Sequence, residues 1–294
     1  MKITNIGNLP APLVAAVMND DYSRGDADWS VSDLINPVQL TTLKKRYWSE
    51  ITEDASDRIW SLAGRAVHKI LEMAKEKHTL QEERLFATVL GRKISGSFDR
   101  YDDGVLQDWK FVGAWSGRFE SRLWEWTKQL NSYAWLLREH GFPVTRLEIV
   151  AIYRDWKKTD ALRSADYPQR KAEVIPIPLY AHEEAGQFLK ERVQALIDAE
   201  DVPDDNLPNC SAEEMWLREI KWALKKKKNK RATKNYETEM EAKKALAEQA
   251  KPEEFEVVEK PGARLRCESY CSASLFCSQH VTFKSLQEDA DASV

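Results

Sequence analysis

Two aspartates and a lysine lie close together in the middle of this 294-residue sequence, at spacings that suit metal-dependent chemistry. Asp99 ends one predicted strand, and Asp108 and Lys110 lie on the next, with a turn predicted at Asp102-Asp103-Gly104. A hairpin over residues 93–112 would bring Asp99 and Asp108 together. Strand alternation would also place Asp108 and Lys110 on one face.

Carboxylates in such an arrangement suit a hard divalent cation, Mg²⁺ or Mn²⁺, which prefers oxygen ligands. The cation would activate water and offset the charge that develops on a phosphodiester. A neighbouring lysine can orient that water or stabilise the charged transition state. Taken alone, Asp-x-Lys is a common pattern. The alternative interpretation is a pair of solvated hairpin carboxylates beside an exposed lysine.

Two predicted helices, over residues 57–77 and 120–140, flank this hairpin and carry further polar residues. His68 lies on the first helix, and Gln129 and Tyr133 lie four residues apart on one face of the second. A lone histidine on an apolar helix is more often a hydrogen-bonded core residue than a ligand. A Gln–Tyr pair at this spacing is also usually structural, so the order of the motifs carries more information than any one of them.

That order is Gly-x-x-x-His, Gly-x-x-Asp, Asp-x-Lys and Gln-x-x-x-Tyr. With it the sequence resembles the RecB-type branch of the PD-(D/E)XK nucleases, over roughly residues 55–155. The resemblance implies a metal-dependent DNA nuclease, expected to be an exonuclease that acts on DNA ends or single strands. It also implies a role in phage or prophage DNA processing or recombination, with a helicase or recombination protein as a candidate partner.

The same resemblance implies roles for individual residues. The expected metal ligands are His68, Asp99, Asp108 and the carbonyl group of Trp109. Lys110 would be the catalytic lysine, and Gln129 and Tyr133 would position the DNA backbone. A supporting acidic residue is expected at Glu82 or Glu83, and the sequence does not choose between them.

Four cysteines follow the nuclease motifs: Cys210 and the compact trio Cys267, Cys271 and Cys277. Four thiolates are the number that an iron–sulfur cluster or a structural zinc requires. Many RecB-type nucleases hold a [4Fe–4S] cluster with three clustered C-terminal cysteines and a remote one. Here Cys210 follows the histidine helix instead of preceding it, so Zn²⁺ is an alternative to [4Fe–4S]. Buried thiols are the third interpretation, and His280 is a spare candidate ligand.

A basic segment lies between Cys210 and the cysteine trio, and we expect it to form a hairpin tip near Lys228-Asn229. Its positive residues are Lys225, Lys226, Lys227, Lys228, Lys230 and Arg231. They could bind DNA phosphates without regard to sequence. The alternative is a solvated turn, which is the usual state of a charge run.

The hydrophobic periodicity predicts an α/β fold with a mixed central sheet flanked by helices, a restriction-endonuclease-like core on the resemblance above. Besides the two helices already given, the sequence predicts strands over 82–90, 93–100, 105–112, 144–154 and 172–178 and a helix over 180–200. Residues 1–200 would form the nuclease core with its lead-in. Residues 201–260 would form a charged insertion, and 261–294 a cysteine-ligated metal-binding segment with an acidic tail.

A formal net charge of −4 excludes a chain that is polybasic throughout, but not a locally positive cleft. The sequence lacks an apolar run of about 18 residues and an apolar leader, so we expect no membrane partner and a cytoplasmic setting, in the host if the chain is phage-encoded. Two alternative hypotheses are a non-catalytic DNA-binding module on a nuclease fold and an iron–sulfur or zinc protein that is the partner of a helicase. The intact motif set favours the enzyme.

Overall fold

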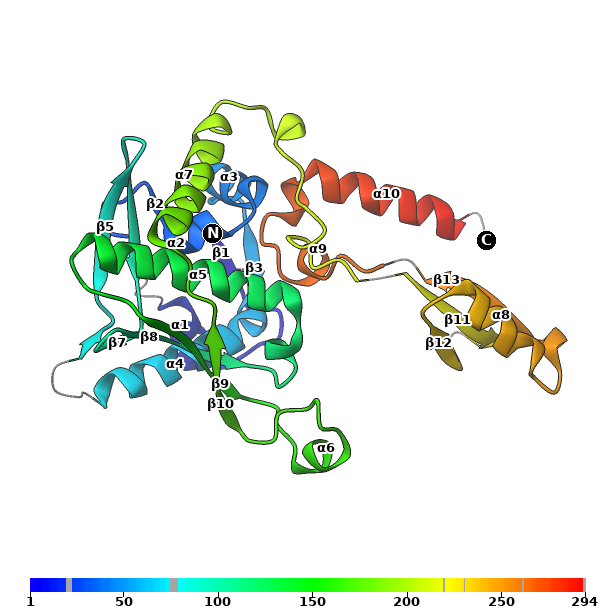
Figure 1. Cartoon of the computed structure of the whole chain (residues 1–294). Coiled ribbons are helices and arrows are strands. Elements are labelled where there is room, and N and C mark those ends of the chain that lie inside the picture. The colour runs from blue at the N-terminus through cyan, green and yellow to red at the C-terminus, as the bar shows by residue number, and fades with distance from the viewer. Residues whose placement is uncertain (20–22, 75–78, 219, 230, 261, 293–294) are drawn as a thin grey trace. The chain divides into compact units, whose positions relative to one another are not determined.

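The computed structural model describes residues 1–19, 23–74, 79–218, 220–229, 231–260 and 262–292 (Figure 1). The chain divides into two compact units. The first comprises Met1–Asn209 with Leu275–Val294, and the second comprises Cys210–Ser274. The second unit therefore contains parts of both the expected charged insertion and the expected cysteine segment.

The first unit is built on a five-stranded sheet with the order β10-β9-β8-β7-β4. Its strands are β4 (Leu80–Gln81), β7 (Arg100–Asp102), β8 (Val105–Val112), β9 (Arg146–Tyr153) and β10 (Ala172–Ile177). β8 and β9 pair in parallel, whereas the other neighbours are antiparallel. Leu147, Ile149 and Ala151 alternate along β9 and are fully buried. The predicted mixed α/β architecture is confirmed.

The strand expected over residues 93–100 is divided between two sheets, which corrects the hairpin prediction. β6 (Arg92–Ser97) pairs with β5 (Arg84–Val89) and with β2 (Trp29–Ser30) in a separate three-stranded sheet. The chain then crosses at Phe98, which is 1% exposed, and only β7 pairs with β8. The predicted turn is confirmed, since Asp103 and Gly104 both have positive φ, at 41° and 83°, as in a type I′ turn.

Helices cover this core on more than one side. They are α1 (Ala11–Met18), α2 (Val31–Ile35), α3 (Val38–Arg46), α4 (Ile59–Met73), α5 (Glu120–Glu139), α6 (Lys158–Arg163), α7 (His182–Asp198) and α10 (Ser278–Ala292). α4, α5 and α7 match the three predicted helices, although residues 75–78 of the first lie outside the described part of the chain. Figure 1 shows β7 and β8 between α4 and α5, and both helices contact β8.

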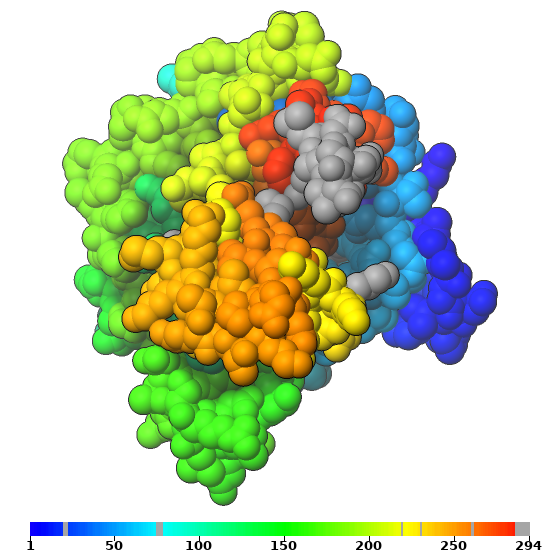
Figure 2. Space-filling model, turned by 90° about the vertical axis from the view of Figure 1, so that its right-hand side faces the viewer, coloured from blue at the N-terminus to red at the C-terminus, as the bar shows by residue number. Residues whose placement is uncertain are grey.

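Shorter elements complete the first unit. A parallel pair joins β1 (Lys2–Thr4) to β3 (Thr52–Asp54). Short 3-10 helices lie at Ala55–Arg58, Ser116–Arg118 and Asp204–Asn206. Residues 154–171, which include α6, project from the body of the unit in both views (Figures 1 and 2).

The second unit contains a three-stranded antiparallel sheet with the order β12-β11-β13. Its elements are β11 (Lys221–Lys226), β12 (Lys234–Tyr236), α8 (Glu239–Ala247), a 3-10 helix (Pro252–Glu254), β13 (Phe255–Lys260) and α9 (Leu265–Ser269); a further 3-10 helix spans Ser274–Phe276 at the boundary. α8 begins with a capping box between Thr238 and Glu241, and Ala242 is buried where this helix packs on the sheet. The basic segment begins at the end of β11 and continues towards β12, which pairs with β11, so the predicted hairpin is confirmed. Among the described residues, no helix combines the length and apolar character that crossing a membrane requires.

Candidate active site

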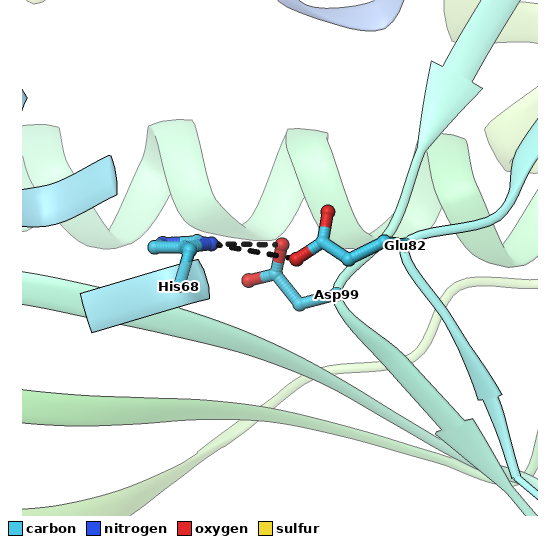
Figure 3. A group of neighbouring side chains, drawn as sticks. All are labelled: His68, Glu82 and Asp99. Atoms are coloured by element: carbon cyan, nitrogen blue, oxygen red, sulfur yellow. Dashed lines mark ion pairs between the residues drawn. The ribbon is translucent and has the colours of Figure 1, made fainter. Parts of the chain in front are cut away.

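Three side chains from separate parts of the chain converge (Figure 3): His68 from α4, Glu82 just after β4, and Asp99 between β6 and β7. The Nδ1 atom of His68 lies 3.4 Å from Asp99 Oδ1 and 3.8 Å from Glu82 Oε1. One ligand atom from each residue lies within 4.8 Å of the other two. Asp99 is buried, whereas a third of the His68 and Glu82 side chains is exposed, so the group is accessible from solvent. We refer to these three residues as the His68 group.

The backbone at Glu82 explains why this residue, and not Glu83, joins the group. Glu82 has a φ of 53°, in the left-handed region that non-glycine residues seldom adopt. Its N–H donates to the carbonyl oxygen of Asp99 at 3.2 Å. Outliers of this kind concentrate at functional sites because the surrounding structure must hold them in place. The sequence contained no signal for this conformation, whereas the structure places the Glu82 carboxylate in the group.

Both polar groups of the Trp109 backbone contact this cluster. Its N–H donates to Asp99 Oδ2 at 2.5 Å, and its carbonyl oxygen lies 3.1 Å from Nε2 of His68. A neutral imidazole that donates from Nε2 leaves the lone pair of Nδ1 directed at Glu82 and Asp99. The Trp109 oxygen is thus a contact of the histidine, and its expected role as a cation ligand stays a prediction.

The two carboxylates raise the pKa of His68 to about 10, mainly through the interaction with Asp99 and then through that with Glu82. Partial burial of the ring acts in the opposite direction. Without a metal ion the group is therefore completed by an imidazolium. The proton on His68 supplies the positive charge that a bound cation would replace.

Asp108 lies on β8 next to this group and is 3% exposed. Its Oδ2 atom forms an ion pair with Lys110 Nζ at 2.5 Å. Burial raises the pKa of Asp108 to about 6, and the charge of Asp99 adds to this rise. Lys110 and His68 oppose it, so both cations stabilise the ionised carboxylate.

A hydrogen-bonded chain continues from Lys110 into α5. Lys110 Nζ donates to Gln129 Oε1 at 2.9 Å, and Gln129 Nε2 donates to Tyr133 Oη at 3.0 Å. The lysine can only donate, so the amide oxygen of Gln129 faces it and the amide nitrogen is left to donate to the tyrosine hydroxyl. Gln129 and Tyr133 are thereby linked to Lys110, and the DNA contact expected of them stays a prediction. Asp108, Lys110, Gln129 and Tyr133 form what we call the lysine relay.

Two glycines near these residues have different surroundings. A Cβ atom on Gly96 would lie 2.7 Å from Leu136 Cδ1 and 2.9 Å from Tyr133 Cδ1. The glycine of the Gly-x-x-Asp motif therefore lets α5 pack closely on β6 and seats the Tyr133 ring. A Cβ atom on Gly64, one turn before His68, would meet nothing within 4 Å.

The cysteines and the basic segment follow the residues of the His68 group and the lysine relay in the sequence. Cys210, Cys267 and Cys271 belong to the second unit, whereas Cys277 belongs to the first, where its Sγ lies 3.3 Å from Gln39 Oε1. The [4Fe–4S] or zinc site stays a prediction.

Two of the basic side chains have partners within the second unit. Lys225 pairs with Glu256 at 3.1 Å, and the Lys226 ammonium lies 5.5 Å from the centre of the Phe255 ring. Lys227, Lys228 and Arg231 are exposed, and Lys230 lies outside the described residues. The DNA contact predicted for this segment therefore depends on these exposed side chains.

Comparison with known proteins finds no family model that matches the chain, and no curated protein matches it. Among solved structures, the crystal structure of SSO0001 is 16% identical, with a TM-score of 0.41, over 62% of this chain and 82% of that one. A protein from Eubacterium rectale described as a "putative exonuclease" is 13% identical, with a TM-score of 0.38, over 59% of this chain and 82% of that one. At these values the likeness is partial and identifies neither a family nor a reaction.

Proposed function

We propose that this chain is a divalent-cation-dependent deoxyribonuclease, an exonuclease that hydrolyses phosphodiester bonds at DNA ends or in single strands. One observation carries the proposal. The His68 group and the lysine relay meet at the backbone of Trp109, between Asp108 and Lys110. The backbone of Trp109 is thereby the meeting point of residues from α4, β8 and α5 and of Asp99, which lies at the crossover between β6 and β7.

The donor atoms of the His68 group fit a Mg²⁺ or Mn²⁺ ion. Two carboxylates provide the hard oxygen ligands that these ions prefer, and His68 adds one nitrogen ligand. Glu82, Asp99 and His68 would hold the ion, with Asp108 beside them. When bound, the ion supplies charge neutralisation at the phosphate and lowers the pKa of a coordinated water.

Lys110 would stabilise the negative charge that builds on the phosphate oxygens as a water oxygen bonds to phosphorus and the phosphorus–oxygen ester bond breaks. The attacking water releases one proton to solvent and the departing sugar oxygen takes up one, so the step adds one water molecule across the ester bond. Gln129 and Tyr133 are positioning residues, because they act on the reaction by fixing Lys110 Nζ. Asp108 contacts the same ammonium, so two side chains hold Lys110 Nζ directly and Tyr133 acts through Gln129.

A cleavage assay on end-labelled single- and double-stranded DNA with Mg²⁺, Mn²⁺ or EDTA tests this proposal. We expect cation-dependent shortening of the labelled strand, lost in Asp108→Ala and in Lys110→Ala. The product ladder would reveal the polarity of cleavage. Asp102→Ala is a matched control, because Asp102 lies in the same hairpin but pairs with Arg100 at 2.8 Å.

Circular dichroism melting of each variant separates loss of chemistry from loss of folding. Wild-type protein that binds DNA tightly but leaves it intact with every cation would contradict the nuclease. It would support the non-catalytic DNA-binding module instead.

From the cysteine spacing we also propose that Cys210, Cys267, Cys271 and Cys277 hold a [4Fe–4S] cluster or a zinc ion. Cys271→Ser should lower both the bound iron or zinc and the resistance to thermal unfolding, since such a site contributes folding energy. Elemental analysis of protein purified without oxygen measures the first quantity and distinguishes the two metals. An unchanged metal content in the variant would reject the site.

A further inference from the structure

An exposed tryptophan lies on α4 two helical turns before His68. Trp60, Gly64 and His68 follow one another at intervals of four residues, so they lie along one ridge of the helix. The rise per residue of an α-helix separates the first from the third by about 12 Å along the axis. Trp60 is 55% exposed, although its indole is among the largest apolar surfaces that a protein can bury.

Arg154 links the Trp60 ring to β8. The Arg154 guanidinium carbon lies 4.5 Å from the centre of the Trp60 ring, in a cation–π contact. The backbone N–H of Arg154 donates to the carbonyl oxygen of Val112, the last residue of β8. Val112 is two residues beyond Lys110, so the Trp60–Arg154 pair lies at the end of the strand that carries the lysine relay.

The surface between this pair and His68 is open at Gly64. A Cβ atom there would meet nothing within 4 Å, and the residue is helical, so neither close packing nor backbone conformation requires glycine. Glycine inside a helix is less stable than alanine. A backbone without side chain at this point lets a ligand that follows the ridge approach the helix closely.

Further exposed cations follow Arg154 along the chain. Arg154 begins the projecting segment that Figures 1 and 2 show, and Lys157 and Lys158 are exposed within it. Aromatic rings interleaved with cations are the recurrent means of binding single-stranded nucleic acid, with bases stacked on the rings and phosphates held by the cations. A base must be unpaired to stack on a side chain in this way, which favours a single strand over a duplex.

We infer that Trp60, Gly64 and Arg154 form a subsite for single-stranded nucleic acid, with one base stacked on Trp60 and a phosphate bound by Arg154. The strand then runs along the α4 ridge to the His68 group. This inference deepens the proposed nuclease and rests on it for what happens at the end of the ridge. We call the three residues the strand subsite.

Fluorescence anisotropy with a labelled oligothymidylate in EDTA tests the stacking, because no cleavage occurs without a cation. Loss of one base–aromatic stack weakens binding by about 5- to 150-fold. We expect a loss in this range for Trp60→Ala and wild-type affinity, to within about threefold, for Trp60→Phe. An oligomer of the same length without bases should bind the wild type and Trp60→Ala equally.

Trp48 is a matched control. It is 49% exposed and has the Lys44 ammonium 5.6 Å from the centre of its ring, but it follows α3, which packs on α7 and away from β8. Trp48→Ala should therefore leave the affinity unchanged. Arg154→Gln should reduce the slope of log affinity against log salt concentration by about 0.7, the value for one phosphate contact on a single strand. Lys44→Gln should leave that slope as it is.

Equal affinities in Trp60→Ala and Trp48→Ala would overturn the inference, as would wild-type protein that does not bind the oligomer. These outcomes are separate from failure of the proposed nuclease. Protein that binds through Trp60 but cleaves nothing keeps the strand subsite and loses the enzyme. Protein that cleaves DNA without dependence on Trp60 keeps the enzyme and loses the subsite.

Discussion

His68 and Trp109 are 41 positions apart in the sequence, and Nε2 of the histidine ring lies 3.1 Å from the tryptophan carbonyl oxygen. The N–H of the same tryptophan binds Asp99. One peptide segment of β8 therefore orients two members of the His68 group, while the side chains before and after it belong to the lysine relay. Because the Trp109 backbone makes these contacts, it fixes the position of the His68 group relative to Lys110.

Glu82→Gln should weaken Mn²⁺ binding, because it replaces a carboxylate of the His68 group with a neutral amide. We expect a loss of about 10- to 100-fold, the range found when metal sites lose a supporting group. Isothermal titration calorimetry measures the affinity directly. Glu83→Gln is the matched control, since Glu83 is adjacent, exposed and outside the group, and should change the affinity by less than about threefold. Equal losses in both variants would contradict the assignment.

Gln129→Leu should lower kcat and leave KM nearly unchanged, because Lys110 loses the acceptor that fixes its ammonium group. The expected loss is about 10- to 100-fold. Tyr133→Phe should cause a smaller loss, since the amide stays but loses its orienting hydroxyl. Gln187→Leu is the control, because the Gln187 amide is exposed on α7 and donates to Glu191. Steady-state kinetics would reject the positioning role if KM rose while kcat stayed constant.

Gly96→Ala and Gly64→Ala should change stability in opposite directions. At Gly96 the added methyl group would lie within 3 Å of Leu136 and Tyr133, and overpacking of this kind costs about 1–3 kcal/mol. At Gly64 the methyl group meets no atom, so the higher helix propensity of alanine should stabilise the protein by up to about 1 kcal/mol. Urea unfolding measures both changes.

The strand subsite also predicts how Gly64→Ala should change DNA binding. Its affinity for the oligothymidylate should fall even as its stability rises. A variant that is more stable and binds as well as the wild type would show that the open surface at Gly64 serves no ligand.

Asp54→Asn should make stability less dependent on acid pH. The Asp54 carboxylate accepts hydrogen bonds from the backbone of Ile6, from Ser56 and from Thr4, and these contacts, the first above all, hold its pKa well below the usual value. The pKa of Asp54 is lower in the folded state than in the unfolded state. The stability that the ionised carboxylate contributes is therefore fully present above about pH 4, the unfolded pKa, and is lost as the pH falls further.

The difference in melting temperature between wild type and Asp54→Asn should accordingly be largest above about pH 5 and shrink towards pH 2. Asp57→Asn, three residues away and exposed, is the control and should show no such trend. A difference that grew with acidity would contradict the depressed pKa.

Much of the fold could be predicted from local patterns. The apolar periods of α4, α5 and α7 are long enough to distinguish a helix from a strand, and the alternation in β8 and β9 is regular. Once these elements were placed, the order of the motifs selected His68, Asp99, Lys110 and Gln129. The structure brings all four to one place.

Strand pairing and side-chain direction could not be predicted in this way. β6 pairs with β5 across the turn at Leu90 and Gly91, and the chain then crosses at the buried Phe98 into a second sheet, a division that alternation does not reveal. Glu82 has a positive φ, donates its N–H to Asp99 and belongs to the His68 group, whereas Glu83 does not. Trp60 and Arg154 meet because β9 lies beside β8. Residue types and spacing are local properties, whereas these contacts depend on how separate elements pack, and packing depends on the whole chain.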